Sequence, residues 1–253
     1  MRILTMALGV PFPPLGGGLT RTFHLLRSLA AHHELVLAAF TYGERHADPP
    51  FPVQVKMVPW RWSQDYQEMI GDDAVAARRA FEKLAYESDD PWFVSAADPT
   101  LMEEALRAAL RTPVDLVLLE GTPLARFRHV LPRGIPRVLD LLDVQSLIAR
   151  RAAQAGGANG ADGRQREAQR TLAFERAAAQ SCDLCLAVSD AEASAARELL
   201  GIDQMYVVPN GVDTSFFTPS AAEPASASLL FTGRMSYEPN ADAVSHFTED
   251  ILP

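Results

Sequence analysis

Two kinds of hydrophobic pattern take turns along the chain. Short apolar runs predict strands over 2–8, 34–40, 53–59, 114–120, 137–142, 183–188 and 205–208. The nearly continuous run over 114–120, and the similar run over 137–142, are typical of strands covered on both faces. Longer stretches with apolar residues three or four positions apart predict helices over 20–31, 65–87, 100–110, 146–180 and 190–200. Because strands and helices alternate, the pattern predicts an α/β fold: a Rossmann-like, doubly wound and mostly parallel sheet of about six or seven strands.

Local signals refine two of these helices. Residues 156–163 contain four glycines, which are poor helix formers, so the long helical stretch over 146–180 should be interrupted there by a surface loop. Ser189 precedes the helix over 190–200 and is a suitable N-cap.

The pattern changes after residue 218. Residues 219–228 are rich in Pro, Ala, Ser and Glu, which is typical of a linker. A strand over 229–232 and a helix over 240–251 are expected to follow. We therefore predict a first domain at 1–218, a linker at 219–228, and at 229–253 the first strand and helix of a truncated second domain.

Composition excludes several classes of protein. The 253 residues are 48% apolar and 22% charged, as in ordinary globular domains. The net charge of -9 argues against nucleic-acid binding, and two cysteines cannot build a disulfide framework. No apolar run approaches the roughly 20 residues of a membrane span, and the N-terminus lacks a signal-peptide pattern. These features favour a cytoplasmic protein.

Three segments carry candidate chemistry. Gly16-Gly17-Gly18 lies between the first strand and the first helix, where backbone N–H groups favour an anion such as phosphate. It matches neither the G-x-G-x-x-G pattern nor the P-loop, and it is equally readable as a flexible turn. The other two segments are 207–219, with Asn210-Gly211, and 230–243, where Gly233 and Arg234 precede a helix. On their own they are readable as a surface loop and a solvated arginine.

In this order the segments resemble glycosyltransferase family 4, the retaining nucleotide-sugar transferases of the GT-B fold. The resemblance to the family covers essentially the whole chain. Within the family, the chain most resembles bacterial sugar transferases of exopolysaccharide gene clusters, which is a weaker identification. It is carried by Gly16-Gly17, Phe174-Glu175, Asp183, Ala187-Val188-Ser189-Asp190, Val208-Pro209-Asn210-Gly211-Val212-Asp213, Phe217, Pro219, Phe231-Thr232-Gly233-Arg234 and Pro239-Asn240.

The resemblance implies two Rossmann-like domains facing each other across a cleft, with the acceptor held by the first and the nucleotide-sugar donor by the second. It implies no obligatory metal and no cofactor beyond the nucleotide-sugar. The acceptor would be a glycan, a lipid-linked glycan or a small molecule, with peripheral contact at the cytoplasmic membrane face. Gly16 and Gly17 would lie near the donor phosphates, and Arg234 would neutralise the diphosphate leaving group. Asn210, Gly233 and Asn240 are predicted to bind donor or acceptor.

The chain departs from the family pattern at three places. Asn240 stands where members commonly carry a lysine, and Glu120 stands most nearly where they carry a histidine at a strand end. Glu120 is a candidate for orienting an acceptor hydroxyl, or alternatively caps local backbone. The family's paired glutamates would lie beyond Pro253, so we expect residues 1–253 alone to be inactive.

Other residues keep two interpretations each. Asp140 and Asp143 flank a strand end and would contact acceptor hydroxyls or cap the next helix. Trp60 and Trp62 would stack on a sugar, lie against a membrane, pack in the core or anchor a loop. Cys182 and Cys185 are expected to be core residues rather than metal ligands. The functional alternative to a glycosyltransferase is a non-catalytic Rossmann-like binding module.

Overall fold

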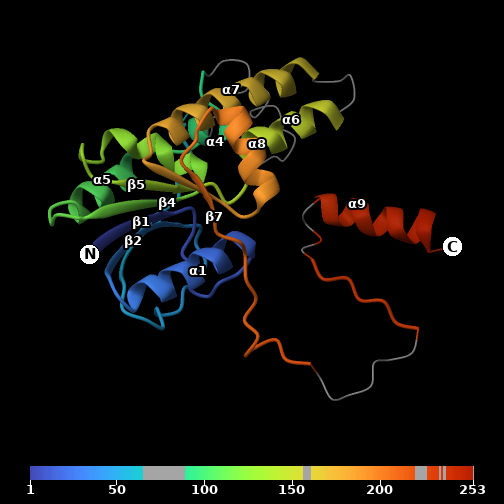
Figure 1. Cartoon of the computed structure of the whole chain (residues 1–253), viewed down its shortest axis with the longest axis horizontal. Coiled ribbons are helices and arrows are strands. Elements are labelled where there is room, and N and C mark those ends of the chain that lie inside the picture. The colour runs from blue at the N-terminus through green and yellow to red at the C-terminus, as the bar shows by residue number, and fades with distance from the viewer. Residues whose placement is uncertain (65–88, 156–160, 220–226, 234, 236–237, 253) are drawn as a thin grey trace. The chain divides into compact units, whose positions relative to one another are not determined.

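The computed structural model describes residues 1–64, 89–155, 161–219, 227–233, 235 and 238–252 (Figure 1). Internal contacts divide the chain into two units, Met1–Asn210 and Gly211–Pro253, and each is described by itself. The helix predicted over 65–87 lies outside the described residues. The predicted domain limits, with a linker at 219–228, stay a prediction.

Seven strands of the described chain form one sheet, and every neighbouring pair is parallel. The order across the sheet is β3-β2-β1-β4-β5-β6-β7. The strands are β1 (Arg2–Ala7), β2 (Glu34–Thr41), β3 (Gln54–Pro59), β4 (Leu116–Glu120), β5 (Arg137–Asp140), β6 (Leu184–Ala187) and β7 (Met205–Val207). The doubly wound parallel sheet predicted from the alternating pattern is therefore confirmed.

Helices follow most of these strands, as expected for parallel pairs, but the connection between β2 and β3 over 42–53 contains no helix. The first unit contains α1 (Gly17–Ala30), α4 (Trp92–Ser95), α5 (Thr100–Ala109), the 3-10 helix η1 (Thr122–His129), α6 (Gln145–Ala155), α7 (Ala161–Gln180) and α8 (Asp190–Leu200). The glycine loop predicted over 156–163 is wrong at 161–163, which form the first turn of α7, and 156–160 lie outside the described residues. Ser189 caps α8 as predicted, since its side chain accepts a hydrogen bond from the Glu192 N–H.

The apolar core lies on both faces of the sheet. On one face, Leu26 of α1 and Phe12 pack against Ile3, Leu35 and Leu37 of the strands. The other face is covered by α5, α7, α8 and η1, whose buried residues include Met102, Leu106, Phe127, Ala178, Ala193 and Leu200. Alternate residues of each strand thus face opposite layers, which explains their continuous apolar runs.

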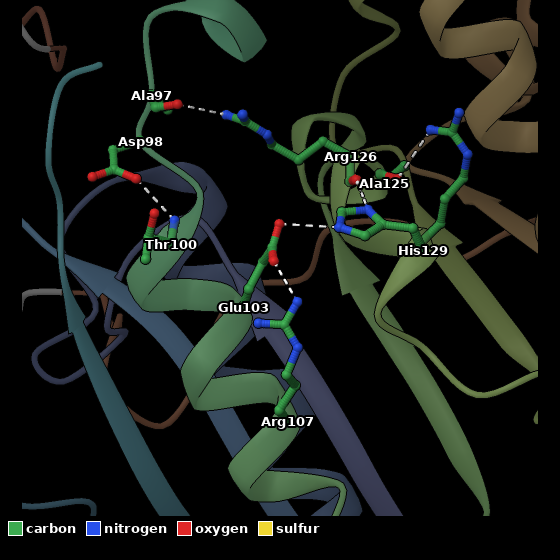
Figure 2. Close-up of polar contacts among 9 residues, drawn as sticks. Ala97, Asp98, Thr100, Glu103, Arg107, Ala125, Arg126 and His129 are labelled. Carbon is green, nitrogen blue, oxygen red and sulfur yellow. Dashed lines mark hydrogen bonds and ion pairs between the residues drawn. The ribbon is translucent and has the colours of Figure 1, made fainter. Parts of the chain in front are cut away.

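A polar cluster fixes the segment between α4 and α5 against η1 (Figure 2). Arg126 donates to the carbonyls of Val94 at 2.6 Å and Ala97 at 3.1 Å. Glu103 of α5 lies between Arg107 and His129, at 2.6 and 3.0 Å (Figure 2). Although burial alone would raise it, these two partners lower the pKa of Glu103. The cluster holds α5 beside the segment that follows β4.

The second unit differs from its prediction in one respect. Residues 229–232 form no strand in the structure, whereas the predicted helix is present as α9 (Glu238–His246) and the π-helical turn η2 (Phe247–Ile251). A strand requires hydrogen bonds to a neighbouring strand, and the described part of this unit offers no second extended partner. No helix among the described residues is long and apolar enough to cross a membrane.

Candidate functional site

The sheet changes its winding direction between β1 and β4. After β1, the chain adds β2 and β3 one after the other on one side of β1. It then adds β4 to β7 one after the other on the opposite side of β1. Because all strands are parallel, their carboxyl ends share one edge, and α/β folds bind ligands where the strand order reverses at that edge. The predicted residues Gly16, Gly17, Glu120 and Asp140 follow or end β1, β4 and β5 there.

The glycine turn delivers the chain into α1. Gly16 has φ 98° and ψ 158°, a backbone region that only glycine adopts readily. Helix α1 begins at Gly17, one turn earlier than the apolar pattern indicated, and no side chain caps its first N–H groups. A Cβ atom at Gly17 would meet nothing within 4 Å. The N-terminus of α1 is therefore an open, positively polarised end at the carboxyl edge of the sheet.

Arg21 of α1 ties this helix to three other segments. Its Nε donates to Asp140 Oδ2 at 2.7 Å, and its Nη1 donates to the Val208 carbonyl at 2.7 Å and to Asn210 Oδ1 at 3.1 Å. Both members of the Arg21–Asp140 ion pair are buried, with side-chain exposures of 5% and 0%. The remaining nitrogen, Nη2, is buried without a hydrogen-bond partner. Sequence reasoning placed Asp140 and Asn210 at the site separately, and the structure joins them through Arg21.

Glu120 is the most perturbed acid of the site. Its side chain is fully buried at the end of β4, where Oε2 accepts a hydrogen bond from Thr22 at 3.2 Å. Its Oε1 has no hydrogen-bond partner in the part of the chain that the structure describes. Burial and the nearby Asp140 carboxylate raise the pKa of Glu120 to about 8. Glu120 is therefore predominantly a neutral acid at pH 7. In this conformation it contacts α1 rather than solvent.

Asp140 shares this environment. Burial raises the pKa of Asp140, while Arg21 and the Leu142 N–H act in the opposite direction. Since Arg21 stabilises the Asp140 charge directly, we assign the negative charge to Asp140 and the proton to Glu120. Asp140 is therefore buried and bonded to Arg21 of α1, and it does not face solvent.

Glu175 of α7 forms a second buried carboxylate centre. Its Oε1 accepts from Thr122 Oγ1 at 3.0 Å and the Gln145 N–H at 2.9 Å, and its Oε2 accepts from the N–H and hydroxyl of Ser146 at 2.9 and 2.6 Å. Glu175 therefore satisfies the first turn of α6. The suggestion that Asp140 or Asp143 caps this helix is replaced by Glu175 in the structure. Asp143 is exposed, and burial together with the Asp143 charge raises the pKa of Glu192.

In the second unit, Gly233 lies against Asn240. A Cβ atom at Gly233 would come within 2.8 Å of the Phe231 ring and within 2.9 Å of Asn240 Nδ2. Glycine is thus required for this close approach, and two residues predicted from one sequence segment lie together. Arg234, predicted to bind the diphosphate, lies outside the described residues.

Sequence reasoning missed Arg21 and Thr22. Both are buried on α1, next to a turn that had drawn attention only for its glycines. A charged residue and a hydroxyl on the inward side of an otherwise apolar helix were the available signal, because buried charges require partners. Glu175 entered only as part of the family resemblance, with no role of its own.

Trp60 and Cys182 pack against the core and Cys185 is buried in it, whereas Trp62 is exposed. Trp60 packs edge-on against Phe40 at 4.9 Å and lines a cavity of about 190 Å³ with Tyr42 and Arg126. Cys185 is buried in the core, and burial raises the pKa of its thiol to about 12. Among the described residues, no three His, Cys, Asp or Glu side chains form a group that could hold a metal ion.

Solved structures are similar to this chain in fold. Sucrose-phosphate synthase from Thermosynechococcus elongatus superposes with a TM-score of 0.56 at 13% identity, over 87% of this chain and 51% of that chain. HepE from Anabaena, solved with UDP and glucose, gives a TM-score of 0.49 at 14% identity, over 86% and 47%. At this identity the likeness concerns the fold alone. The chain spans about half the length of these structures.

Sequence comparison gives the family directly. No curated protein matches the chain at a significant level. The family model for Glycosyltransferase Family 4, in contrast, matches residues 15–216, from the glycine turn through β7 and beyond. This match takes in most of the chain and both buried carboxylate centres, and the chain therefore belongs to Glycosyltransferase Family 4.

Proposed function

We propose that this chain forms the acceptor-side half of a cytoplasmic, retaining glycosyltransferase that uses a nucleotide-sugar donor and no obligatory metal. The observation that carries the proposal is the open N-terminus of α1, held at the point where the sheet reverses its winding. Family membership supplies the reaction class. The donor sugar would be transferred to a hydroxyl of a glycan, a lipid-linked glycan or a small molecule.

The start of α1 has the properties required near the donor diphosphate. The N–H groups of its first turn lack intrahelical acceptors, and the helix dipole favours an anion at this end. The first turn carries no acidic residue that would repel phosphate. Since the space above Gly17 is open, a phosphate oxygen can approach the backbone closely.

The buried network beneath α1 would keep this end in place. Arg21 links α1 to β5 through Asp140 and to the end of β7 through Val208 and Asn210. Thr22 links α1 to Glu120 at the end of β4. We assign Glu120 and Asp140 as positioning residues of the glycine turn. Direct contact between Glu120 and an acceptor hydroxyl, as expected from the sequence, stays a prediction.

In the transfer step, the bond between the anomeric carbon and the diphosphate oxygen breaks and a bond to the acceptor oxygen forms. The departing diphosphate gains negative charge, and its oxygen takes the proton that the acceptor hydroxyl loses. Arg234 is the proposed cation that stabilises this charge, from its place in the family pattern. Arg234→Ala should therefore lower kcat more than it raises KM for the donor.

A binding experiment on Gly17 tests the proposal. In the protein that carries both domains, UDP-, GDP- and ADP-sugars are titrated by calorimetry into the wild type and into Gly17→Val. Released nucleotide is assayed in parallel. We expect Gly17→Val to fold normally, since its side chain enters open space, and to bind donor much more weakly. Ala31→Val, at an exposed position at the other end of α1, is the matched control.

Two results would contradict the proposal. Equal donor binding by wild type and Gly17→Val would remove the α1 turn from the donor site. Absence of nucleotide-sugar binding and turnover in a protein that carries both domains would favour the non-catalytic binding module. For residues 1–253 alone, we expect no sugar transfer, because the cleft needs a second wall to align donor and acceptor.

A further inference from the structure

A second cavity, of about 280 Å³, lies between α4, α6 and α7. Its lining includes Trp92 and Phe93 from α4 and Gln145 and Ile148 from α6. Helix α7 contributes Arg164, Glu167 and Thr171. Gln145 lies two residues after Asp143, and its N–H donates to Glu175. The cavity is therefore next to the segment that follows β5, at the same edge of the sheet as the glycine turn.

The cavity is mostly apolar but contains an incompletely paired carboxylate. Glu167 is 8% exposed, and its Oε1 accepts a hydrogen bond from the Trp92 N–H at 3.0 Å. Its Oε2 is buried and has no hydrogen-bond partner among the described residues. A buried carboxylate oxygen without a donor is unfavourable, so a group that supplies a donor at this place is stabilised.

Aromatic rings form the other wall. Trp92 and Phe93 meet edge-on with their centroids 6.4 Å apart, and Phe93 packs edge-on against Phe174 of α7 at 5.9 Å. These contacts fix Phe93 where α4 meets α7. A cavity of about 150 Å³ already accepts a benzene ring, so this one accommodates a six-membered ring with its substituents.

We propose that this cavity binds one sugar ring of the acceptor, with a ring hydroxyl donating to Glu167 Oε2 and the apolar ring face against Trp92. A hydroxylated ring has both an apolar face and hydrogen-bond donors, and the cavity offers a counterpart for each. A purely apolar group would leave Oε2 without a donor. The inference rests on the proposed function only in calling the sugar an acceptor, because the binding itself requires no transfer.

The test uses methyl hexopyranosides as probes and protein NMR as the readout. Methyl glucoside, galactoside and mannoside are titrated separately into the 1–253 protein, and the signals of Trp92 and Thr171 are followed. Cyclohexylmethanol serves as the apolar ring without ring hydroxyls. We expect saturable shifts at Trp92 and Thr171 with at least one hexopyranoside, and weaker binding of cyclohexylmethanol.

Three variants sharpen the test. Glu167→Gln preserves the shape and an acceptor for Trp92 but removes the charge, and it should weaken sugar binding about tenfold or more. Ala152→Trp fills the cavity from an exposed position and should abolish binding. Glu103→Gln removes a carboxylate on α5, outside this cavity, and should bind like wild type.

Each outcome decides the inference. Absence of shifts with all three hexopyranosides, equal binding by Ala152→Trp, or equal binding of cyclohexylmethanol with no effect of Glu167→Gln would overturn it. Sugar binding here, together with absence of nucleotide-sugar binding by a protein that carries both domains, would uphold the cavity and contradict the proposed function. Donor binding and transfer by the two-domain protein, without sugar binding here, would do the reverse.

Discussion

Glu120 and Glu175 are both fully buried, but their carboxylates have opposite surroundings. Glu175 accepts four hydrogen bonds that include two backbone N–H groups at the start of α6. Glu120 accepts a single hydrogen bond from Thr22, and its second oxygen has no partner. One side chain completes the fold, whereas the other is held at the carboxyl edge in an unfavourable environment.

The difference in hydrogen bonding distinguishes a buried carboxylate that stabilises the fold from one that belongs to a functional site. A carboxylate whose oxygens are fully paired stabilises the native state, and its removal should mainly affect stability. An acid whose pKa is raised by burial and by a neighbouring carboxylate is typical of functional sites. Glu120 lies beneath the helix that begins at the glycine turn, so its neutral form would keep that helix in place beside Asp140.

The largest loss of stability is expected when Glu175, the fully paired carboxylate, is removed. Glu175→Ala leaves Thr122, Gln145 and Ser146 with four donors that lose their acceptor. With about 1–3 kcal/mol for each unsatisfied buried group, we expect a loss of at least about 4 kcal/mol. Urea unfolding measures it, and Glu104→Gln, at an exposed position of α5, is the control. A loss below about 1 kcal/mol would show that water or other groups replace Glu175.

A slightly smaller effect is expected from the ion pair under α1. Arg21→Met keeps much of the side chain's volume but leaves Asp140 buried without its cation, which typically costs about 3–5 kcal/mol. The double variant Arg21→Met/Asp140→Leu should recover much of this stability, because no charge remains uncompensated. Unfolding curves of the three proteins test the coupling, and additive losses would argue against the ion pair.

The glycine turn provides a matched pair with a smaller difference. Gly16→Ala places a side chain at φ 98°, which should cost about 1–3 kcal/mol. Gly17→Ala is helical and enters open space, so it should be neutral or stabilise α1 by up to about 1 kcal/mol. Thermal unfolding of the two variants distinguishes them. Equal melting temperatures would mean that the backbone at Gly16 relaxes readily.

Much of the fold follows from periodicity alone. The continuous apolar run that became β4 predicted a strand covered on both faces, and it lies between β1 and β5. Ser189 predicted the start of α8, because an N-cap of this kind depends only on the local sequence. The strand expected over 229–232 failed for the opposite reason, since a strand depends on partners elsewhere in the chain.

The candidate site was predictable only as separate positions. Gly16, Glu120 and Asp140 stand at strand ends, so topology places them at one edge once the strands are known. The ion pair between Arg21 and Asp140 was not predictable, because the two residues lie 119 positions apart in the sequence. The cap of α6 by Glu175 likewise comes from a distant helix, and no local pattern encodes it.

The most direct test of the account is the charge state of Glu120. Its pKa is raised from the ordinary 4.5 to about 8, so the folded protein keeps a proton there that the unfolded chain releases. The stabilising neutral form is fully present below about pH 4.5, and its contribution declines as the pH rises towards 8. Glu120→Gln mimics the neutral acid and does not titrate, so it should match the wild type near pH 5.

The measurement is the free energy of unfolding of wild type and Glu120→Gln, by urea, from pH 5 to pH 9. The account predicts that the wild type loses stability relative to Glu120→Gln, by about 1.4 kcal/mol per pH unit where the slope is steepest, and that the difference levels off above about pH 8. Parallel curves for the two proteins over the whole range would contradict it, because Glu120 would then carry the same charge in the folded and unfolded chain.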